Sequence, residues 1–404
     1  MANVSSSNGL EKCPKLRFPG FDEPWVVRKL SDILSQRIEK QVPSEDAPLM
    51  AFTAEGGVEP KGERYDRSYL VKSEDKLYKR TEYNDFIYSS NNLDVGSIGL
   101  NKYGTAVISD VYEIFSVKSD CLPTFVSELI QRPQNLAKIL KYRQGCLYGQ
   151  YRIYAEDFLS VSVFVPAKQE QNEIAQFLDS IDKRIAHQHS LIEALKKYKR
   201  GLQNRFFFKR SHLSPKASEI DSHDVEPLGS VVHINPKTGS LPEAFIYIDL
   251  ECVESGVLNS KKLISRNSAP SRAQRLLEEG DLLYQMVRPY QKNNYYFQKA
   301  FEYPTVASTG YAQIRCSKMD TQFIFEQLSS DYFAREAMLR STGTGYPAIN
   351  ADDLAEIPIW VPPLNQQEKI GAALSSLGEK IEVHQKLLSA LCSVKSSLMQ
   401  QLFI

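Results

Sequence analysis

The chain has 404 residues, of which 42% are hydrophobic and 24% are charged, and its 49 Lys and Arg residues balance 49 Asp and Glu residues. This composition is typical of a globular protein, and a chain of this length divides most simply into two or more domains. It has no run of about 18 apolar residues, and its opening, MANVSSSNGLEK, lacks the layout of a secretion signal. We therefore expect a cytoplasmic protein with no membrane association.

The charge balance bears on the class of partner. A free-standing nucleic-acid-binding protein is usually basic overall, so a formal net charge of zero counts against DNA binding. That argument weakens if basic residues gather on one face, or if partner subunits supply much of the phosphate contact. The six cysteines are scattered, with no C-x-x-C pair and no histidine at metal-ligand spacing, so we expect reduced thiols and no metal site.

Residues 1–165 are predicted to form the first of two mixed domains. Its β-rich runs are FIYSS (86–90), TAVIS (105–109) and YEIFSV (112–117), and a helical stretch lies near 123–142. A long helix is predicted at 166–210, and the polar segment at 210–224 is typical of a linker.

Residues 211–361 are predicted to form the second mixed domain. Its β-rich runs are FIYIDL (245–250), LLYQMV (282–287) and YAQIRC (311–316), with a helical stretch near 321–340. A second long helix is predicted at 362–404. The predicted fold class is therefore α+β.

The chain contains the same unit twice, and this repeat decides the architecture. The stretch VPAKQEQNEIAQFLDSIDKRI, from Val165, aligns without a gap with VPPLNQQEKIGAALSSLGEKI, from Val361, a shift of 196 residues. The same shift relates EYNDFIYSS, from Glu82, to EEGDLLYQM, from Glu278. Each half is therefore predicted to be a divergent copy of one domain followed by one long helix.

Apolar residues recur along both long helices with the spacing of a heptad seam. Polar residues interrupt the first seam at Gln188 and Lys199 and the second at His384 and Lys395, which are matching positions. We therefore predict that the two helices, each roughly 60 Å long, pair with each other. The seam consists of Ile174, Leu178, Ile181, Ile185, Ile192, Leu195, Leu202, Ile370, Leu374, Leu377, Ile381, Leu388, Leu391 and Leu398.

The predicted arrangement of the helices follows from the duplication. A repeated unit closes on itself most simply about a pseudo-two-fold axis, which makes the helices antiparallel. The expected architecture is two pseudo-two-fold-related domains separated by an antiparallel two-helix coiled coil.

These features resemble the specificity subunits of type I restriction-modification enzymes, over nearly the whole chain. The family pattern P-x-x-x-E-Q-x-x-I-A-x-x-L-x-x-x-D-x-x-I, later followed by G-L-x-x-x-x-F, is met by the first copy, from Pro166 to Phe207. The second copy departs from it at Gln366 and Gly378, where carboxylates are usual. The segment from Trp25 through KLSD also resembles the opening of a target-recognition domain.

The resemblance implies a function and a set of partners. Each domain would recognise one half of a bipartite, asymmetric target in double-stranded DNA, and the helices would set the distance between the halves. Two methyltransferase subunits would dock on the helical region, and motor-nuclease restriction subunits would join them. S-adenosylmethionine, ATP and Mg²⁺ would be used by these partners, in adenine N6 methylation and DNA cleavage, and the chain itself would bind no cofactor.

Candidate DNA contacts are polar and aromatic residues on loops, because base edges and phosphates are bound by such side chains. The alternative for each residue is a solvated loop side chain. In the first domain the candidates are Ser89, Asn91, Asn92, Lys102, Tyr103, Arg143, Gln144 and Arg152. In the second domain they are Gln285, Arg288, Tyr290, Lys292, Asn293, Asn294, Arg340, Ser341 and Thr342.

A basic cluster near the end of the first long helix supports two interpretations. It contains Lys196, Lys197, Lys199, Arg200, Arg205, Lys209 and Arg210. These residues could bind DNA, but basic residues are also favoured near a helix C-terminus by the helix dipole alone. The sequence does not decide between the two.

Catalytic and scaffolding functions are the competing hypotheses. A self-contained methyltransferase would need a glycine-rich cofactor loop and an N/D-P-P-Y/F motif, and Asn235-Pro236-Lys237 lacks the second proline and the aromatic residue. The chain also has no P-loop, H-E-x-x-H or G-x-S-x-G motif. A coiled-coil scaffold with two protein-binding heads stays open as an alternative, as does the specificity subunit of a related methyltransferase-nuclease system.

We predict that the purified chain alone has no DNA methylation, DNA cleavage or ATPase activity, because its sequence holds no catalytic motif for these reactions. Assays of the three activities with the isolated chain test this. Activity in a preparation free of partner subunits would contradict it.

Overall fold

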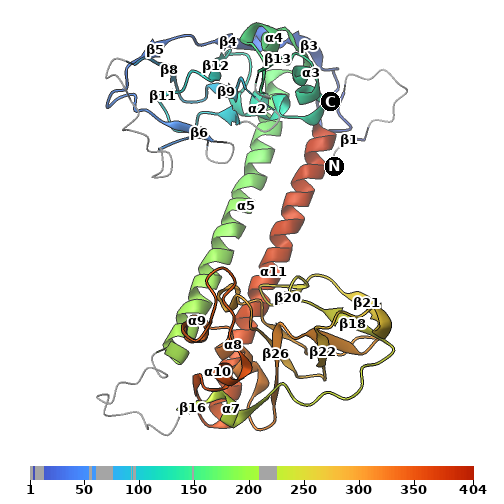
Figure 1. The fold of residues 1–404 in the computed structure, drawn as a ribbon. Helices are drawn as coiled ribbons and strands as arrows, with labels where there is room; N and C mark the ends of the chain where they lie inside the picture. The colour runs from blue at the N-terminus through green and yellow to red at the C-terminus, as the bar shows by residue number, and fades with distance from the viewer. Residues whose placement is uncertain are drawn as a thin grey trace. The chain divides into compact units, whose positions relative to one another are not determined.

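The computed structural model describes residues 3–4, 13–53, 57–60, 76–91, 93, 97–147, 150–208 and 225–404 (Figure 1). The candidate residue Asn92 and the predicted linker at 210–224 lie outside these ranges. The chain divides into two compact units, Met1–Ala186 with Ser389–Ile404, and His187–Leu388. We call the globular part before helix α5 (Lys168–Gln203) domain 1, and the part between α5 and helix α11 (Leu364–Leu402) domain 2.

Domain 1 is built on a four-stranded antiparallel sheet in the order β10-β9-β12-β4, beside a three-stranded sheet, β11-β8-β5. Three pairs, β15-β3, β13-β14 and β6-β7, are separate, as is the pair β1-β2. The elements are β1 (Asn3–Val4), β2 (Leu16–Arg17), β3 (Val26–Lys29), α1 (Leu30–Ile33), β4 (Leu34–Gln36), β5 (Lys40–Gln41), β6 (Ala51–Thr53), β7 (Gly57–Glu59), β8 (Tyr78–Thr81), β9 (Phe86–Ser89), β10 (Ile98–Leu100), β11 (Ala106–Ile108), β12 (Tyr112–Val117), α2 (Pro123–Ile130), α3 (Pro133–Leu140), β13 (Gln144–Leu147), β14 (Gln150–Arg152), α4 (Ala155–Ser160) and β15 (Ser162–Val165).

Domain 2 repeats the central sheet in the same order, β24-β23-β26-β17. Its second sheet, β21-β18-β25-β22, is larger and includes the parallel pair β18 and β25, where the described part of domain 1 has a parallel bridge between Leu49 and Val107. The elements are β16 (Val225–Pro227), α7 (Leu228–Val231), β17 (Val232–Ile234), β18 (Ala244–Ile248), β19 (Val253–Glu254), β20 (Val257–Leu258), β21 (Lys262–Ser265), η4 (Arg266–Ser268), β22 (Ala273–Leu276), β23 (Leu282–Gln285), η5 (Pro289–Gln291), β24 (Tyr295–Tyr296), β25 (Thr305–Ser308), β26 (Tyr311–Cys316), α8 (Thr321–Leu328), α9 (Asp331–Leu339), α10 (Ala351–Ala355) and β27 (Pro358–Trp360).

The shared strand order confirms the predicted α+β duplication. The register agrees as well, because β12 sets Phe115 opposite Phe86 on β9, and β26 sets Ile314 opposite Leu282 on β23. Phe86 and Leu282 are 196 positions apart, which is the shift between the two sequence repeats, whereas Phe115 and Ile314 are 199 apart, because the segment between the paired strands is three residues longer in domain 2.

The helical stretch expected in each domain is divided into two helices. In domain 1, Pro133 begins α3, because proline is tolerated in the first turn of a helix but not in its interior. In domain 2 the Oγ atom of Ser330 accepts a hydrogen bond from the N–H of Phe333 at 3.2 Å and so caps the start of α9.

The two long helices begin with the same anchor. The side chain of Gln171 accepts from the N–H of Leu122 at 3.0 Å and donates to the carbonyl of Pro166 at 3.0 Å. Its counterpart Gln367 accepts from the N–H of Asp320 at 3.0 Å. Both glutamines are buried, so each start of a long helix is bound to the domain that precedes it in the chain.

Buried aromatic rings fix the ends of the long helices. A short π-helix (Asn204–Phe208) follows α5, and its Phe207 packs on Phe323, which in turn packs on Trp360 of domain 2. At the matching position after α11, Phe403 packs on Trp25 and on Phe125 of domain 1. Each long helix therefore joins the core of one domain at its start and the core of the other domain at its end.

Contacts within each unit show that the helices pair antiparallel, as predicted. Lys395 of α11 donates to Asp182 of α5 at 2.6 Å, whereas His384 of α11 lies beside Gln188 of α5, with 2.8 Å between Nδ1 and Nε2. From Asp182 to Gln188 the residue number on α5 rises, whereas from Lys395 to His384 the number of the contacting residue on α11 falls, as antiparallel pairing requires. Every residue of the predicted seam is buried or half-buried in the structure.

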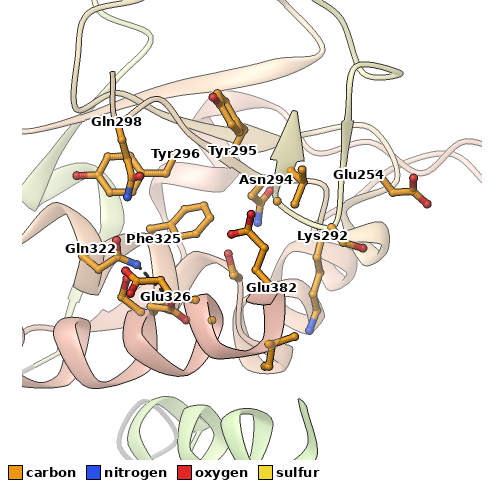
Figure 2. Close-up of a pocket in the computed structure, with 18 of the residues that line it drawn as sticks. Glu254, Lys292, Asn294, Tyr295, Tyr296, Gln298, Gln322, Phe325, Glu326 and Glu382 are labelled. Carbon is orange, nitrogen blue, oxygen red and sulfur yellow. Dashed lines mark hydrogen bonds between the residues drawn. The ribbon is translucent and has the colours of Figure 1, made fainter. Parts of the chain in front are cut away.

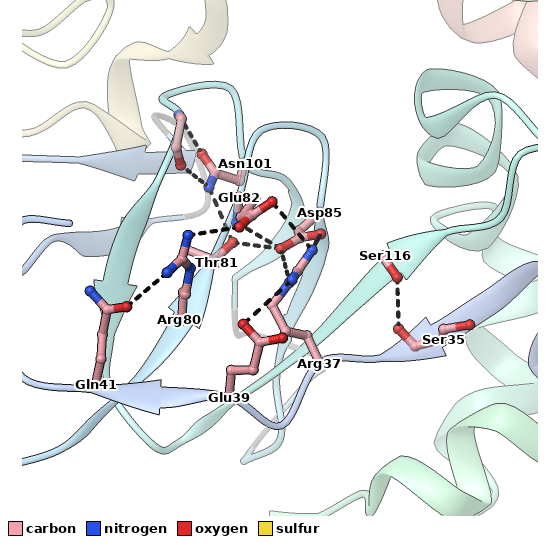
Figure 3. Close-up of polar contacts among 11 residues, drawn as sticks. Ser35, Arg37, Glu39, Gln41, Arg80, Thr81, Glu82, Asp85, Asn101 and Ser116 are labelled. Carbon is pink, nitrogen blue, oxygen red and sulfur yellow. Dashed lines mark hydrogen bonds and ion pairs between the residues drawn. The ribbon is translucent and has the colours of Figure 1, made fainter. Parts of the chain in front are cut away.

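Each central sheet contains a buried carboxylate bound by an arginine. Asp85 accepts from Nε of Arg37 at 2.7 Å in domain 1 (Figure 3), and Asp281 accepts from Nε of Arg315 at 2.7 Å in domain 2. The hydrogen bond to the aspartate raises the pKa of both arginines. Asp85 and Asp281 are equivalent positions, but Arg37 follows β4 whereas Arg315 lies in β26, so the sequence alignment alone does not show the shared ion pair.

We predict that Arg17→Met destabilises the chain by about 3 to 5 kcal/mol, because it would leave Glu170 buried without a counter-charge. Two hydrogen bonds of 2.9 and 2.7 Å join the guanidinium of Arg17 to the carboxylate of Glu170. This hydrogen bonding raises the pKa of Arg17. Urea unfolding of the full chain measures the loss. As a control, Lys183→Met removes the exposed ion pair with Asp179 and should change stability by less than about 1 kcal/mol. Equal losses in the two variants would contradict the prediction.

Candidate nucleic-acid interface

In domain 1 the two loops predicted to contact DNA meet through their backbones. The N–H of Ile153 donates to the carbonyl of Ser90 at 2.9 Å, and Asn91 forms a β-bridge with Arg152. The segment after β9 is thereby joined to the β13-β14 hairpin. We call this meeting of two segments the loop junction.

Domain 2 has the same loop junction. The N–H of Ile349 donates to the carbonyl of Met286 at 3.1 Å, and Val287 forms a β-bridge with Ala348. Each of these four residues lies 196 positions after its counterpart in domain 1. The duplication therefore preserves the backbone of the junction while its side chains differ.

Arginine and tyrosine side chains are paired at the loop junction of domain 1. The guanidinium of Arg152 lies 4.9 Å from the ring centre of Tyr154, and that of Arg143 lies 5.6 Å from the ring centre of Tyr151. Both tyrosines are exposed. Cations at these distances are attracted to the ring faces, which helps to hold the charged groups in place at the surface.

A buried carboxylate lies beneath Arg152. Glu113 is 6% exposed and accepts from Nζ of Lys79 at 2.9 Å, while Arg152 lies 3.7 Å away. Lys79 therefore supplies the close counter-charge. Nearly half of the Arg152 side chain is exposed, which leaves it accessible to a ligand.

The other candidates of domain 1 have structural contacts. Ser89 donates to the carbonyl of Asn91 at 2.9 Å, within the loop, and Gln144 donates to Asp157 at 2.6 Å. Lys102 donates to the side chain of Asn84 at 3.0 Å and lines a groove beside α5 with Asp179 and Asp182. Tyr103 is exposed next to Lys102. The structure thus places Lys102 and Tyr103 away from the contacts that form the loop junction.

In domain 2, Gln285 and Asn294 shape the candidate loop from inside. Both are buried, and the N–H of Gln285 donates to Oδ1 of Asn294 at 2.9 Å. The Gln285 side chain also donates to Gln291 at 2.8 Å and accepts from the N–H of Asn293 at 3.0 Å. Oδ1 of Asn293 accepts from the N–H of Ser255 at 3.0 Å. These amides are engaged within the domain, so they fix the loop that carries the exposed side chains.

The tip of this loop is bounded by two residues in the left-handed conformation. Arg288 and Lys292 both have φ of 54°, on either side of Pro289–Gln291. Basic side chains rarely adopt this backbone, and strained positions gather at functional sites. Between them, Tyr290 is 52% exposed.

Arg288 connects the two segments of the domain 2 junction. Its N–H donates to the carbonyl of Pro347 at 2.7 Å, and its guanidinium lies 4.2 Å from the ring centre of Tyr346. Tyr346 is 71% exposed. The residues predicted from the sequence did not include Tyr151, Tyr154 or Tyr346, although in the run YRIY Arg152 already lies between two tyrosines.

The remaining candidates of domain 2 lie after α9. Arg340 donates to Glu336, one helical turn away, at 2.7 Å, and Ser341 donates to the carbonyl of Ala337 at 2.8 Å. Thr342 is exposed and pairs with Ala348 through its backbone. Thr342 is therefore the member of this set that the backbone brings to the loop junction.

The basic cluster at the end of α5 is partly used within domain 2. Lys199 donates to the buried carboxylate of Glu326 at 2.9 Å, and Arg200 donates to Asp331 at 2.6 Å. Lys196 pairs with Glu193 on the same helix at 3.0 Å. Lys196 and Lys199 thus form ion pairs within the protein, whereas the side chain of Arg200 stays 70% exposed beside Asp331. Lys209 and Arg210 lie outside the described residues.

The long helices carry a second apolar face outside the seam. We call it the outer stripe of each helix. On α5 it consists of Leu191, Ala194 and Tyr198, and on α11 of their counterparts Leu387, Ala390 and Val394. Tyr198, Leu387 and Val394 are 58%, 41% and 52% exposed. The repeat alignment contains the signal for this face, because apolar residues recur at matching positions that the seam does not use.

Two features are absent from the described part of the chain. Within it, no group of three or more His, Cys, Asp or Glu side chains could hold a metal ion. The helices described there include none that is long and apolar enough to span a membrane.

The fold and the loop junctions define a class of protein, namely a duplicated two-domain protein on paired helices, with Arg- and Tyr-bearing loops in each domain. The family model described as "Type I restriction modification DNA specificity domain" matches residues 22–197 and 253–392. These ranges cover most of the chain, which therefore belongs to this family, as its resemblance implied. Its role is that of a DNA-target specificity subunit, which recognises DNA and is not the catalytic component.

Curated relatives agree with the family. The type I restriction enzyme MjaVIII specificity subunit of Methanocaldococcus jannaschii is 25% identical over 73% of this chain and 76% of its own length. The putative type I restriction enzyme MjaX specificity subunit of the same organism is 22% identical, over 97% of this chain and 96% of its own length.

Solved structures show the same fold. The S subunit of the type I restriction-modification system from M. genitalium superposes with a TM-score of 0.60 and 16% identity, covering 97% of this chain and 99% of that one. A chain from a study of complex assembly and conformational transition of the type I R-M system superposes with a TM-score of 0.54 and 14% identity, covering 95% and 98%.

Proposed function

We propose that each domain recognises one half of a bipartite DNA target at its loop junction. The observation that supports this proposal is a preserved backbone with different side chains. Asn91 and Arg152 in domain 1 are replaced at the equivalent positions by Val287 and Ala348 in domain 2. A protein that recognises an asymmetric two-part sequence needs the same presenting surface twice, with different contacts on each copy.

The chemistry of the exposed side chains suits DNA. Arginine can bind guanine through two hydrogen bonds in the major groove or bind phosphate, and tyrosine can donate to phosphate oxygens. Arg152 and Arg288 lie against tyrosine rings and are partly ordered in the free protein. They therefore lose less side-chain entropy when they bind DNA. Because the chain has no net charge, we propose that partner subunits supply a large part of the phosphate contact.

The catalytic steps are proposed to lie in the partners. Methyltransferase subunits would transfer a methyl group from S-adenosylmethionine to adenine N6, and restriction subunits would cleave DNA with ATP and Mg²⁺. The chain would bind none of these cofactors and would act in the cytoplasm, where it directs the partners to the target.

The outer stripe is the proposed docking surface for two methyltransferase subunits. It is apolar, exposed and present at the same positions of both repeats, with Tyr198 on α5 matching Val394 on α11. Exposed apolar surface of this kind marks protein interaction sites. Two equivalent stripes on one chain fit two copies of one partner better than two different partners.

The domains should lose their half-sites independently. We predict that Arg152→Ala with Tyr154→Ala weakens recognition of one half-site, and that Arg288→Ala with Tyr290→Ala weakens recognition of the other. Each lost base contact should cost about 1 to 3 kcal/mol, or roughly 5- to 150-fold in affinity. Methylome sequencing of cells carrying the chain and its partners identifies the half-site that is relaxed.

The control for this experiment is Lys183→Ala, which removes an exposed cation whose ion pair, with Asp179, lies within α5. It should leave the methylated sequence unchanged. Relaxation of the same half-site by both double variants would contradict the assignment of one half-site to each domain.

The outer stripe should be needed for assembly. We predict that Tyr198→Asp or Val394→Asp each removes one methyltransferase subunit from the complex, because burying a carboxylate in an apolar interface is costly. The combined variant should remove both. Native mass spectrometry of the co-expressed complex counts the subunits, and Ser396→Asp, at an exposed position on another side of α11, is the control. Full assembly of the combined variant would exclude the outer stripe as the docking surface.

A further inference from the structure

The candidate loop of domain 2 ends in an ion-pair cluster that DNA recognition does not itself explain. Nζ of Lys292 pairs with one carboxylate oxygen of Asp331, at the start of α9, and Nε of Arg200 on α5 donates to the other oxygen at 2.6 Å. Figure 2 shows the Lys292 side chain extending from its loop toward α5. One carboxylate thus binds two cations that come from distant parts of the sequence.

The charge of this cluster resembles that of a phosphate site. Two cations around one anion leave a net positive charge, and Lys and Arg are the side chains that bind phosphate oxygens. Partial burial opposes ionisation of Asp331, but the hydrogen bonds from Lys292 and Arg200 outweigh it and lower the pKa of the carboxyl group. Asp331 is therefore charged at neutral pH.

The cluster is accessible to a ligand. The side chain of Asp331 is 33% exposed and that of Arg200 is 70% exposed. The nearby pair of Lys199 and Glu326 differs, because Glu326 is buried. Lys292 is one of the two residues with a left-handed backbone that bound the loop tip, so the cluster lies at one end of that tip.

We propose that Asp331 is an internal competitor for DNA phosphate. In the free protein it binds Lys292 and Arg200, and an incoming backbone phosphate takes its place on both cations. The aspartate thereby lowers the part of the affinity that depends on phosphate and not on sequence. This proposal rests on the proposed function of domain 2 in DNA binding.

Affinity at several salt concentrations tests the proposal. The full-length chain is titrated into a fluorescein-labelled duplex of mixed sequence, and anisotropy is read over a series of KCl concentrations. Asp331→Asn should tighten binding by roughly 3- to 10-fold at low salt and steepen the slope of log K against log salt by about one for each cation released. Adding Lys292→Gln to this variant should return the slope toward that of the natural chain.

The matched control is Asp352→Asn. Asp352 lies in the first turn of α10 in the same domain, is exposed, and forms no ion pair within the part of the chain that the structure describes. This variant removes the same charge from an equivalent place on a helix and should change affinity much less. Asp331→Ser, which keeps a residue favourable at a helix start, replaces Asp331→Asn if the latter does not fold.

The outcomes separate the two proposals. If the natural chain binds the duplex but Asp331→Asn matches Asp352→Asn, or binds more weakly, the competitor role is wrong and Asp331 only positions the loop. A second duplex contains the target sequence identified by methylome sequencing. If the natural chain binds neither duplex, the proposal that the chain binds DNA is wrong, and the competitor role is wrong with it.

Discussion

The pairing of α5 with α11 is the constraint on which the rest of the molecule depends. Each helix contributes its two ends to the cores of different domains, so neither domain is complete without segments from both helices. Gln171 and Gln367 fix the starts of the helices, and Phe207 and Phe403 fix their ends. Each loop junction is therefore presented by a domain whose core includes residues of both helices.

The framework is not perfectly symmetric, and the difference has a local cause. Lys395 pairs with Asp182, but the residue matching Asp182 in the second copy is Gly378, which has no carboxylate. A Cβ atom at Gly378 would lie 3.1 Å from Nζ of Lys199. Without a partner on α11, Lys199 binds Glu326 of domain 2 instead. One departure from the family pattern thus converts a helix–helix ion pair into a helix–domain ion pair.

The sequence predicted the architecture because repetition and heptad spacing are properties of the chain itself. The seam, the antiparallel pairing and the two mixed domains followed from one shift of 196 residues. The roles of single loop residues could not be predicted, because they depend on neighbours far away in the sequence. Gln285 and Asn294 have the chemistry to contact bases, yet folding buries them beneath the loop. Tyr346 meets Arg288 only when the two loops come together.

The loop junction also bears on how such a protein can evolve. Its two segments are joined by backbone hydrogen bonds, and these do not depend on which side chains the segments carry. The exposed residues on them can therefore change with little effect on folding stability, since surface substitutions outside special backbone positions usually cost little. Mutation can then explore new binding preferences in one domain while the other domain and the helix pair retain their structure.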